Sequence, residues 1–249
     1  MARYQVILAY DGTGFSGSQV QANSRTVQGE LERALRKLGW SERTVIMAGR
    51  TDTGVHATGQ VAAFDFDWAH PAEKLLRALN ADLPPDLVIK DLTPAAADFH
   101  PRFDAASRTY RYRLICTPLR DPLKEKFLWR VWPDVDGEAL KHNAGIFLCT
   151  HDFAAFGSPT TPKGTTTRTV TKTEWKRMPD GEWQFEVTAD AFLYRMVRRM
   201  VFVQVAAAQG RCSVEKVQYA LSKQGRLLSG LAPAHGLTLV EVKYGSQKA

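Results

Sequence analysis

In the first half of the chain, hydrophobic and polar positions alternate with two different periods, which predict strands and helices in a regular order. The run YQVILAY at 4–10 is rich in residues that favour strands, and it ends at the turn signal Asp11-Gly12. Thr26 is placed to cap a helix over 27–38, because apolar residues recur within that segment at the helical period. The other elements predicted in this half are strands at 43–48, 59–66 and 86–92 and a helix at 71–79.

The second half of the sequence repeats this order of elements. The predicted elements are a strand at 107–116, a helix near 137–148, strands near 167–177 and 183–189, a helix over 191–208 and a strand at 237–244. A further short helix is predicted after Ser213. Each half therefore has the order strand–helix–strand–strand–helix–strand, which is that of a split βαβ, ferredoxin-like unit. We expect an α+β fold of two duplicated units that form a mainly antiparallel sheet with helices on one side.

Two segments lie outside the predicted elements. The first, 93–106, is rich in Ala and Pro and joins the two halves, so we expect an N-terminal unit at 1–95 and a C-terminal unit at 96–249. The second, GSPTTPKGTTT at 157–167, has the composition of a long loop. A loop of this length is either a flexible surface connection or a functional flap, and composition alone favours the first.

Composition and charge bear on the partner of the protein and on its location in the cell. The chain has 249 residues, and 33 Lys and Arg against 26 Asp and Glu give a net charge of +7, so a polyanionic partner has to be considered. Three cysteines without a close pairing fit a reducing compartment, and the sequence has neither a targeting segment nor an apolar run long enough to span a bilayer. We therefore expect a cytoplasmic protein without a membrane segment.

Several common kinds of site find little support. Gly12–Gly17 matches the spacing of a dinucleotide-binding loop, but eight residues separate Gly17 from the predicted helix cap at Thr26, and no acidic residue closes the following strand. The six histidines include no pair at the spacing that places two metal ligands on one helix face. The chain also lacks a P-loop and a Gly-x-Ser-x-Gly elbow. We therefore expect no metal and no nucleotide cofactor.

The most informative stretch is GRTDTGVHA at 49–57, which lies between two predicted strands. Asp-Thr-Gly alone would usually be turn chemistry. Here, however, Arg50, Asp52 and His56 gather around two glycines, which let the backbone approach a ligand closely. A carboxylate beside an arginine stays ionised near neutral pH, and an ionised carboxylate suits nucleophilic or glycosidic-bond chemistry.

The stretch GRTDTGVHA closely resembles the catalytic motif of the TruA family of tRNA pseudouridine synthases. The resemblance covers nearly the whole chain in ordered blocks. These blocks are YDGTGFSGSQVQ with TVQGELERAL, NADLPPD at 80–86, FHPRFDAASRTYRY at 99–112, HDFAAFG at 151–157, ADAFLYRMVRRMV at 189–201 and APAHGLTLVEVKY at 232–244. The resemblance implies a homodimeric enzyme that isomerises uridine to pseudouridine in the anticodon stem-loop of tRNA, at tRNA positions 38, 39 and 40, without a metal or organic cofactor.

The resemblance also assigns roles to five residues. Asp52 is the catalytic aspartate, which acts on the ribose or the base of the target uridine, and Arg50 helps to hold that nucleotide out of the stack. Tyr110 stacks on the uracil, Arg195 pairs with Asp52, and Leu237 lines the base pocket. The expected active-site cleft lies between the two halves of the chain.

Each of the four supporting residues also has a plainer interpretation. Arg50 could be a surface residue at a strand end, and Leu237 could be an ordinary core leucine. Tyr110 shares a strand face with Tyr112 and Leu114, as core residues would. Arg195 could belong to a solvated basic helix face.

Charge is concentrated in the C-terminal part of the chain. Residues 191–228 carry seven Lys or Arg against the single acid Glu215, which suits a surface that binds a phosphate backbone but is also common on solvated faces. The residues expected at the RNA backbone are Lys163, Arg168, Arg198 and Arg199. The sequence departs from the family pattern at Thr53, Arg199 and Phe202, where alanine, asparagine and glycine are more usual.

Two other function classes remain as alternatives to the enzyme. A non-catalytic RNA-binding or tRNA-folding protein would bind tRNA in a salt-sensitive way without changing its uridines. A nucleotide-dependent oxidoreductase, suggested by Gly12–Gly17, would be stabilised against heat by NAD or flavin.

Overall fold

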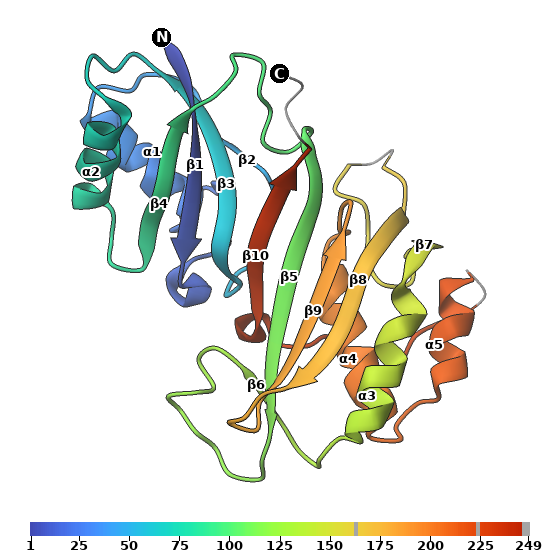
Figure 1. Ribbon diagram of the computed structural model, residues 1–249. Helices are drawn as coiled ribbons and strands as arrows, with labels where there is room; N and C mark the ends of the chain where they lie inside the picture. The colour runs from blue at the N-terminus through green and yellow to red at the C-terminus, as the bar shows by residue number, and fades with distance from the viewer. Residues whose placement is uncertain (162–163, 223–224, 246–249) are drawn as a thin grey trace. The chain divides into compact units, whose positions relative to one another are not determined.

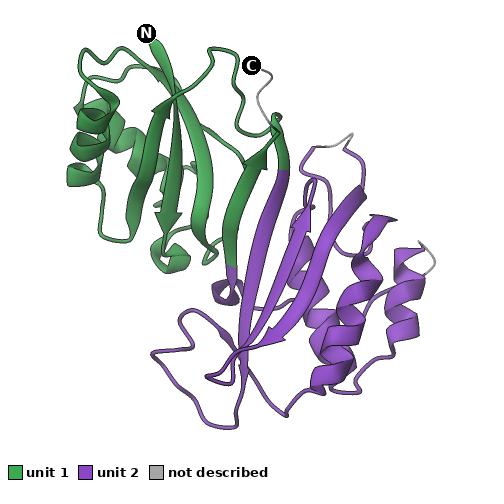
Figure 2. Cartoon of the chain, viewed as in Figure 1, with its two compact units in different colours: residues 1–106, 238–249 green, residues 107–237 purple. Residues whose placement is uncertain are grey.

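A computed structural model describes residues 1–161, 164–222 and 225–245 of the chain. The chain forms two compact units, coloured separately in Figure 2: unit 1 comprises residues 1–106 and 238–249, and unit 2 comprises residues 107–237. The sequence placed the division between residues 95 and 96 and assigned the whole C-terminal strand to the second unit. The C-terminal residues belong to unit 1 because Thr238 and Leu239 pair in parallel with His56 and Ala57.

Unit 1 is built on a split βαβ arrangement (Figure 1). Its elements are β1 (Ala2–Tyr10), the 3-10 turn η1 (Gly12–Gly14), α1 (Val27–Lys37), β2 (Ile46–Met47), β3 (His56–Phe66), α2 (Ala72–Asp82), β4 (Leu87–Pro94) and most of β10 (Leu237–Tyr244). Strand β1 lies between β4 and β3 and is antiparallel to both. The other edge of β3 pairs with β2 near its C-terminal end and with β10 near its N-terminal end.

Local sequence explains the main elements of this unit. Alternate residues of β1 are buried, from Tyr4 to Tyr10, as a strand with one covered face requires. Helix α1 begins where the Thr26 hydroxyl accepts a hydrogen bond from the Gly29 amide, and it buries its apolar face completely. After the helix, the chain turns at Gly39, whose φ of +94° favours glycine.

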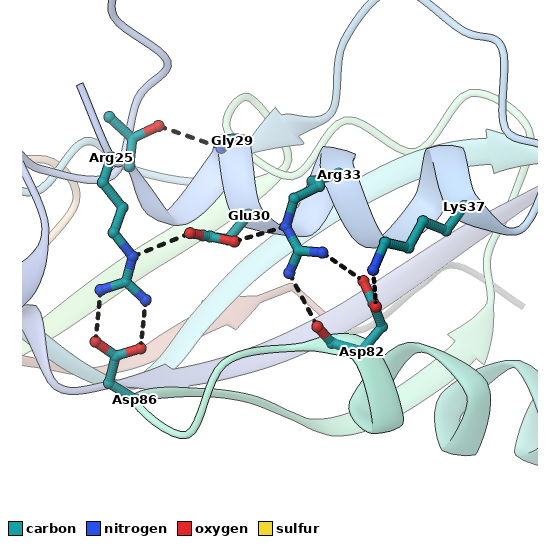
Figure 3. A network of polar contacts seen from close by, with 8 residues as sticks. Arg25, Gly29, Glu30, Arg33, Lys37, Asp82 and Asp86 are labelled. Atoms are coloured by element: carbon teal, nitrogen blue, oxygen red, sulfur yellow. Dashed lines mark hydrogen bonds and ion pairs between the residues drawn. The ribbon is translucent and has the colours of Figure 1, made fainter. Parts of the chain in front are cut away.

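A network of ion pairs joins α1 to α2 and to the start of β4 (Figure 3). Arg25 makes two hydrogen bonds of 2.7 Å with the Asp86 carboxylate and one of 3.0 Å with Glu30. Arg33 bridges Glu30 and Asp82, and Lys37 also pairs with Asp82. The network fixes the helix layer relative to the strand that follows α2.

Unit 2 repeats the same arrangement. Its elements are β5 (Ala105–Cys116), β6 (Trp129–Val131), α3 (Gly137–Ala144), η2 (Gly145–Phe147), β7 (Cys149–Asp152), β8 (Thr167–Arg177), β9 (Trp183–Ala189), α4 (Met196–Ala208), α5 (Val214–Leu221) and η3 (Ala234–Gly236). The strands follow the order β5-β9-β8-β7 with antiparallel neighbours, and the short β6 pairs with β5 in parallel. Helix α3 packs against β8 and α4. The expected α+β fold of two split βαβ units with mainly antiparallel strands is confirmed.

Several element boundaries differ from the sequence prediction. The predicted strand at 43–48 contracts to β2, and the predicted helix at 137–148 ends at Ala144 and continues as the 3-10 turn η2. The largest difference concerns the helix predicted over 191–208, which begins only at Met196. The preceding residues form a loop because the Tyr194 amide bonds to the Ser158 carbonyl and Arg195 has a positive φ.

Candidate active site

The loop that carries Asp52 connects β2 to β3 and is shaped by a tight turn. The Val55 amide donates a 3.1 Å hydrogen bond to the Asp52 carbonyl, and Gly54 between them has a φ of +79°. A turn with this hydrogen bond and a positive φ at its third residue favours glycine there. Asp52 is partly exposed and Arg50, in the same loop, is exposed. The sequence-predicted pair therefore lies on one loop with its backbone fixed.

A set of buried hydroxyl groups holds this loop from the side of β1. The Ser18 hydroxyl accepts a 2.8 Å hydrogen bond from the Thr51 amide, and the Ser18 amide donates one of 3.1 Å to the Thr51 carbonyl. The Thr51 hydroxyl lies 2.9 Å from that of Tyr10. Ser18 is 1% exposed and Thr51 is 7% exposed, so these bonds are shielded from water. We call Tyr10, Ser18 and Thr51 the hydroxyl clamp.

Burial also keeps the clamp's phenol protonated. It raises the pKa of Tyr10 to about 12, and this effect outweighs the opposing influence of Thr51 and Gln60. The Gln60 side chain donates a 2.8 Å hydrogen bond to the Gly49 carbonyl at the start of the same loop. Neutral groups therefore hold the segment that leads to Asp52 at two points, Gly49 and Thr51.

Two glycines of the segment 12–17 allow that segment to approach the Asp52 loop closely. A Cβ on Gly12 would lie 2.0 Å from the Val55 carbonyl oxygen, and one on Gly17 would lie 2.8 Å from that of Thr51. Gly17 also has a φ of +94°. The spacing that imitates a dinucleotide-binding loop is thus used to bring two backbone segments together beside Asp52.

His56 joins the same two segments. Its Nδ1 atom accepts a 3.0 Å hydrogen bond from the Gly12 amide and lies 3.3 Å from Asp11 Oδ1. The histidine is 5% exposed and stands at the first residue of β3, directly after the Asp52 turn. The position of His56 in the GRTDTGVHA motif indicated a role at the site, but the sequence could not show which residues the imidazole contacts.

Three of the predicted site residues belong to unit 2, and two of them are connected through one loop. Tyr110 lies on β5 opposite Val187 and is 9% exposed. Its ring meets the Phe192 ring edge to face, with centroids 5.1 Å apart. Phe192 belongs to the loop that ends at Arg195, so this ring contact links Tyr110 to the segment that presents the arginine.

Arg195 has an unusual backbone conformation. Its φ of 65° and ψ of 5° place it in the left-handed region immediately before α4, and its guanidinium lies 4.7 Å from the Tyr194 ring centroid. Glycine or asparagine usually occupies such a position. The loop is packed closely, because a Cβ on Gly157 would lie 2.4 Å from the Tyr194 carbonyl oxygen. Gly157, at the end of the HDFAAFG block, is a site-supporting residue that the sequence analysis did not single out.

Tyr112 contacts the segment that precedes Leu237. Leu237 is 6% exposed and follows η3, whose Pro233 carbonyl accepts a 2.9 Å hydrogen bond from the Tyr112 hydroxyl. A Cβ on Gly236 would lie 2.6 Å from the Tyr112 ring. Tyr112 is therefore a core residue, and its ring and hydroxyl fix the segment that leads to Leu237.

The residues expected at the RNA backbone have structural contacts of their own. Arg198 Nε donates a 2.8 Å hydrogen bond to the Ala232 carbonyl, and Arg199 donates to that of Gly230. Arg168 donates to the Thr165 carbonyl at 3.0 Å. Lys163 lies outside the described residues. Two of these arginines therefore fasten the segment 230–232 to α4, whatever else their guanidinium groups bind.

Phe202 is one of the departures from the family pattern, and its ring packs against the segment 230–232. A Cβ on Gly230 would lie 1.9 Å from the Phe202 ring, so this glycine lies directly on it. The Arg211 guanidinium lies 5.6 Å from the centroid of the Phe202 ring, which belongs to α4. The ring thus packs under the segment that Arg198 and Arg199 hold in place. The structure gives no account of Thr53, which is exposed.

Residues 1–161, 164–222 and 225–245 contain neither a cluster of metal-binding side chains nor a helix that could span a membrane. Within those ranges, no group of three or more His, Cys, Asp or Glu side chains is arranged to hold a metal ion. None of the described helices is both long and apolar enough to cross a lipid bilayer.

The sequence matches known proteins along nearly its whole length. The family described as tRNA pseudouridine synthase matches residues 6–104 and 144–245. A protein named tRNA pseudouridine synthase A from Chloroflexus aurantiacus is 41% identical over 251 residues, which cover 98% of this chain and 89% of that protein. One of the same name from Limosilactobacillus fermentum is 39% identical over 251 residues, 99% of this chain and 97% of that protein.

A solved structure gives a much weaker likeness. The crystal structure of the archaeal box H/ACA sRNP Nop10-Cbf5 complex aligns with 74% of this chain and 38% of that chain, at 13% identity and a TM-score of 0.38.

Proposed function

Since the chain belongs to the tRNA pseudouridine synthase family and is an isomerase that converts uridine to pseudouridine, we propose that it modifies the anticodon stem-loop of tRNA, at tRNA positions 38, 39 and 40. Asp52 is the catalytic residue in this proposal, and the reaction uses no cofactor. The observation that carries the proposal is the fixed loop of Asp52, which places a partly exposed carboxylate on a backbone held by the hydroxyl clamp.

The chemistry suits a single positioned carboxylate. The N1–C1′ bond of the target uridine breaks, the uracil turns, and a C5–C1′ bond forms, while C5 loses a proton and N1 gains one. Because the product is an isomer of the substrate, no electrons and no group have to be supplied. Asp52 would act either on the ribose or on the base, and in each case it must be ionised, close to the sugar and shielded from competing water.

The supporting residues take the roles that the family motif suggests. Arg50, on the Asp52 loop, would help to hold the target nucleotide out of the stack, because extruding a base costs about a few kcal/mol. Tyr110 would stack on the uracil, a contact worth about 1–3 kcal/mol. Leu237 would line the base pocket.

Arg195 would pair with the Asp52 carboxylate. Its left-handed backbone supports a functional role, because a strained conformation at a non-glycine residue is retained where the surrounding structure and the activity require it. Asp52 belongs to unit 1, whereas Tyr110, Arg195 and Leu237 belong to unit 2. The proposal therefore requires both units to act on one uridine.

The remaining parts of the proposal concern binding and context. Lys163, Arg168, Arg198 and Arg199 would contact RNA phosphates, for which the net charge of +7 is favourable. A homodimer in the cytoplasm is proposed on the family resemblance alone.

The proposal is tested with purified protein and unmodified tRNA in buffer that contains EDTA. The wild type should form pseudouridine at the anticodon-arm positions, as mapped on the product tRNA. Asp52→Asn should form none and should still bind the tRNA. Full activity of that variant would overturn the assignment of Asp52, and tRNA binding by the wild type without any change of uridine would support the non-catalytic alternative.

A further inference from the structure

A turn at the end of unit 1 displays an aromatic ring to solvent. Phe103 is 75% exposed, and its ring stacks on that of His100 with centroids 4.2 Å apart and planes at 30°. The Arg102 guanidinium carbon lies 5.7 Å from the Phe103 ring centroid. The three side chains form a small aromatic and cationic surface, which we call the Phe103 platform.

The platform is held rigidly by its own backbone. The His100 amide donates a 2.7 Å hydrogen bond to the Asp104 carboxylate, and the Asp104 amide donates one of 3.0 Å to the His100 carbonyl. His100 Nδ1 accepts from the amides of Arg102 and Phe103, each at 3.2 Å. These bonds fix the plane of the imidazole, and that plane supports the Phe103 ring.

The turn is also anchored to the core of unit 1. Phe99, at its start, is 6% exposed and meets the Tyr244 ring edge to face at 5.1 Å. The Tyr244 hydroxyl donates a 2.9 Å hydrogen bond to the Pro101 carbonyl. The exposed ring therefore stands on a fixed base, which sets it apart from an apolar side chain that merely happens to lie at the surface.

We propose that the Phe103 platform stacks on an unpaired base of the tRNA substrate. Every nucleobase offers an aromatic face, and proteins bind unpaired bases on exposed aromatic rings beside cationic side chains. A ring that is already held in place loses little entropy when a base covers it. The adjoining guanidinium favours a polyanion over an apolar protein partner. The inference rests on the proposed function, since it assigns a contact for the same substrate.

The position of the platform separates this base from the target uridine. Tyr244, which anchors the turn, lies five residues along β10 from Leu239, and Leu239 pairs with Ala57 just after the Asp52 loop. At about 3.3 Å per strand residue, Tyr244 therefore lies about 17 Å along β10 from Leu239. This equals about five nucleotides at about 3.4 Å each along a stacked strand. The platform would thus hold the RNA several nucleotides away from the reacting base.

The test measures tRNA affinity on an Asp52→Asn background, where no turnover disturbs binding. Adding Phe103→Ala should weaken the binding of unmodified tRNA by about 5- to 150-fold, the loss that corresponds to one base–aromatic stack. Because stacking releases no counterions, the slope of log Kd against log salt concentration should stay unchanged. Phe103→Trp should restore the affinity, and Leu123→Ala, at a side chain that is 88% exposed, should leave it unchanged.

Three results would contradict the proposal that the Phe103 platform stacks on a base. The first is an unchanged Kd for Phe103→Ala, and the second is a weaker Kd with a smaller salt slope, which would indicate lost phosphate contacts instead. The third is a shift of Phe103→Ala from dimer to monomer in sedimentation, which would make the turn a protein interface. Pseudouridine formation by the otherwise wild-type protein is measured separately, so failure of the proposed function is distinguished from failure of the platform.

Discussion

At the scale of single residues, Arg195 shows how sequence and structure inform each other. The motif placed an arginine there, and helical periodicity placed it inside a helix. The structure instead begins the helix one residue later, at Met196, because Arg195 adopts a left-handed conformation that interrupts the pattern. Periodicity reports which face of a segment is buried, but it carries no signal for a single strained φ at a residue other than glycine.

The backbone of Arg195 gives a prediction that separates stability from function. Arg195→Gly should be more stable than Arg195→Ala by about 0.5–1 kcal/mol, because only glycine avoids the steric cost of the left-handed region. Both variants should lose most of their turnover, since both lack the guanidinium. Urea unfolding and pseudouridine formation measure the two effects. If Arg195→Ala proved the more stable of the pair, the left-handed conformation would be refuted.

A matched arginine tests whether the role is specific. Arg198 is one turn further along, and its Nε bonds to the Ala232 carbonyl. Arg195→Ala should therefore reduce turnover far more than Arg198→Ala does. Equal effects would count against the proposed pairing of Arg195 with Asp52.

At the scale of elements, the Asp52 loop depends on contacts that lie far apart in sequence. The position of the following helix argues against a dinucleotide-binding loop in the run from Gly12 to Gly17. Its actual use, to let Val55 and Thr51 approach, depends on how β1 and β3 are paired and was therefore hidden from the sequence. The same holds for Ser18, which no motif marks as different from the other small polar residues around it.

The hydroxyl clamp should affect the chemical step more than substrate binding. Ser18→Ala removes the acceptor of the buried Thr51 amide, which should destabilise the fold by about 1–3 kcal/mol. Because the loss loosens the backbone beside Asp52, kcat should fall by about tenfold or more while KM for tRNA changes little. Single-turnover and steady-state rates of pseudouridine formation distinguish these effects.

Asn80→Ala is the matched control for the clamp. The Asn80 side chain accepts a 2.8 Å hydrogen bond from the Ile89 amide in the same unit, so this variant should lose stability but keep kcat. An equal loss of kcat in both variants would mean that general destabilisation, rather than positioning of Asp52, explains the effect of Ser18→Ala.

The ion pair between Arg25, just before α1, and Asp86, just before β4, predicts how stability depends on pH. Hydrogen bonding from Arg25 lowers the pKa of Asp86 below its ordinary value of 3.8. A carboxyl group with a lowered folded-state pKa stabilises the fold above its unfolded-state pKa, and this contribution is lost as the pH falls through the folded value. Because the pair is partly exposed, Asp86→Asn should cost only about 0.5–1 kcal/mol at pH 7.

Unfolding measured by urea at several pH values checks this prediction. The difference between wild type and Asp86→Asn should shrink as the pH is lowered from about 3.8 downwards. Arg25→Gln should flatten the acid limb in the same way, and the double variant should add little. A difference that stayed constant down to low pH would show that the ion pair is not its source.

At the scale of the whole molecule, the element order of both halves could be predicted because it rests on local periodicity and turn residues. The division into units could not, because it depends on the pairing of Thr238 and Leu239 with residues more than 180 positions earlier in the chain. The family resemblance identified the chemistry from ordered motifs. The contacts that position those motifs became visible only in the folded chain.

The most direct test of the account follows the hydrogen at C5 of uridine, which must leave when the C5–C1′ bond forms. Unmodified tRNA labelled with tritium at C5 is mixed with excess wild-type protein, Asp52→Asn, or Asp65→Asn as a control carboxylate that pairs with Arg3. The account predicts tritium release by the wild type and by Asp65→Asn and none by Asp52→Asn. Release by Asp52→Asn at the wild-type rate would contradict it.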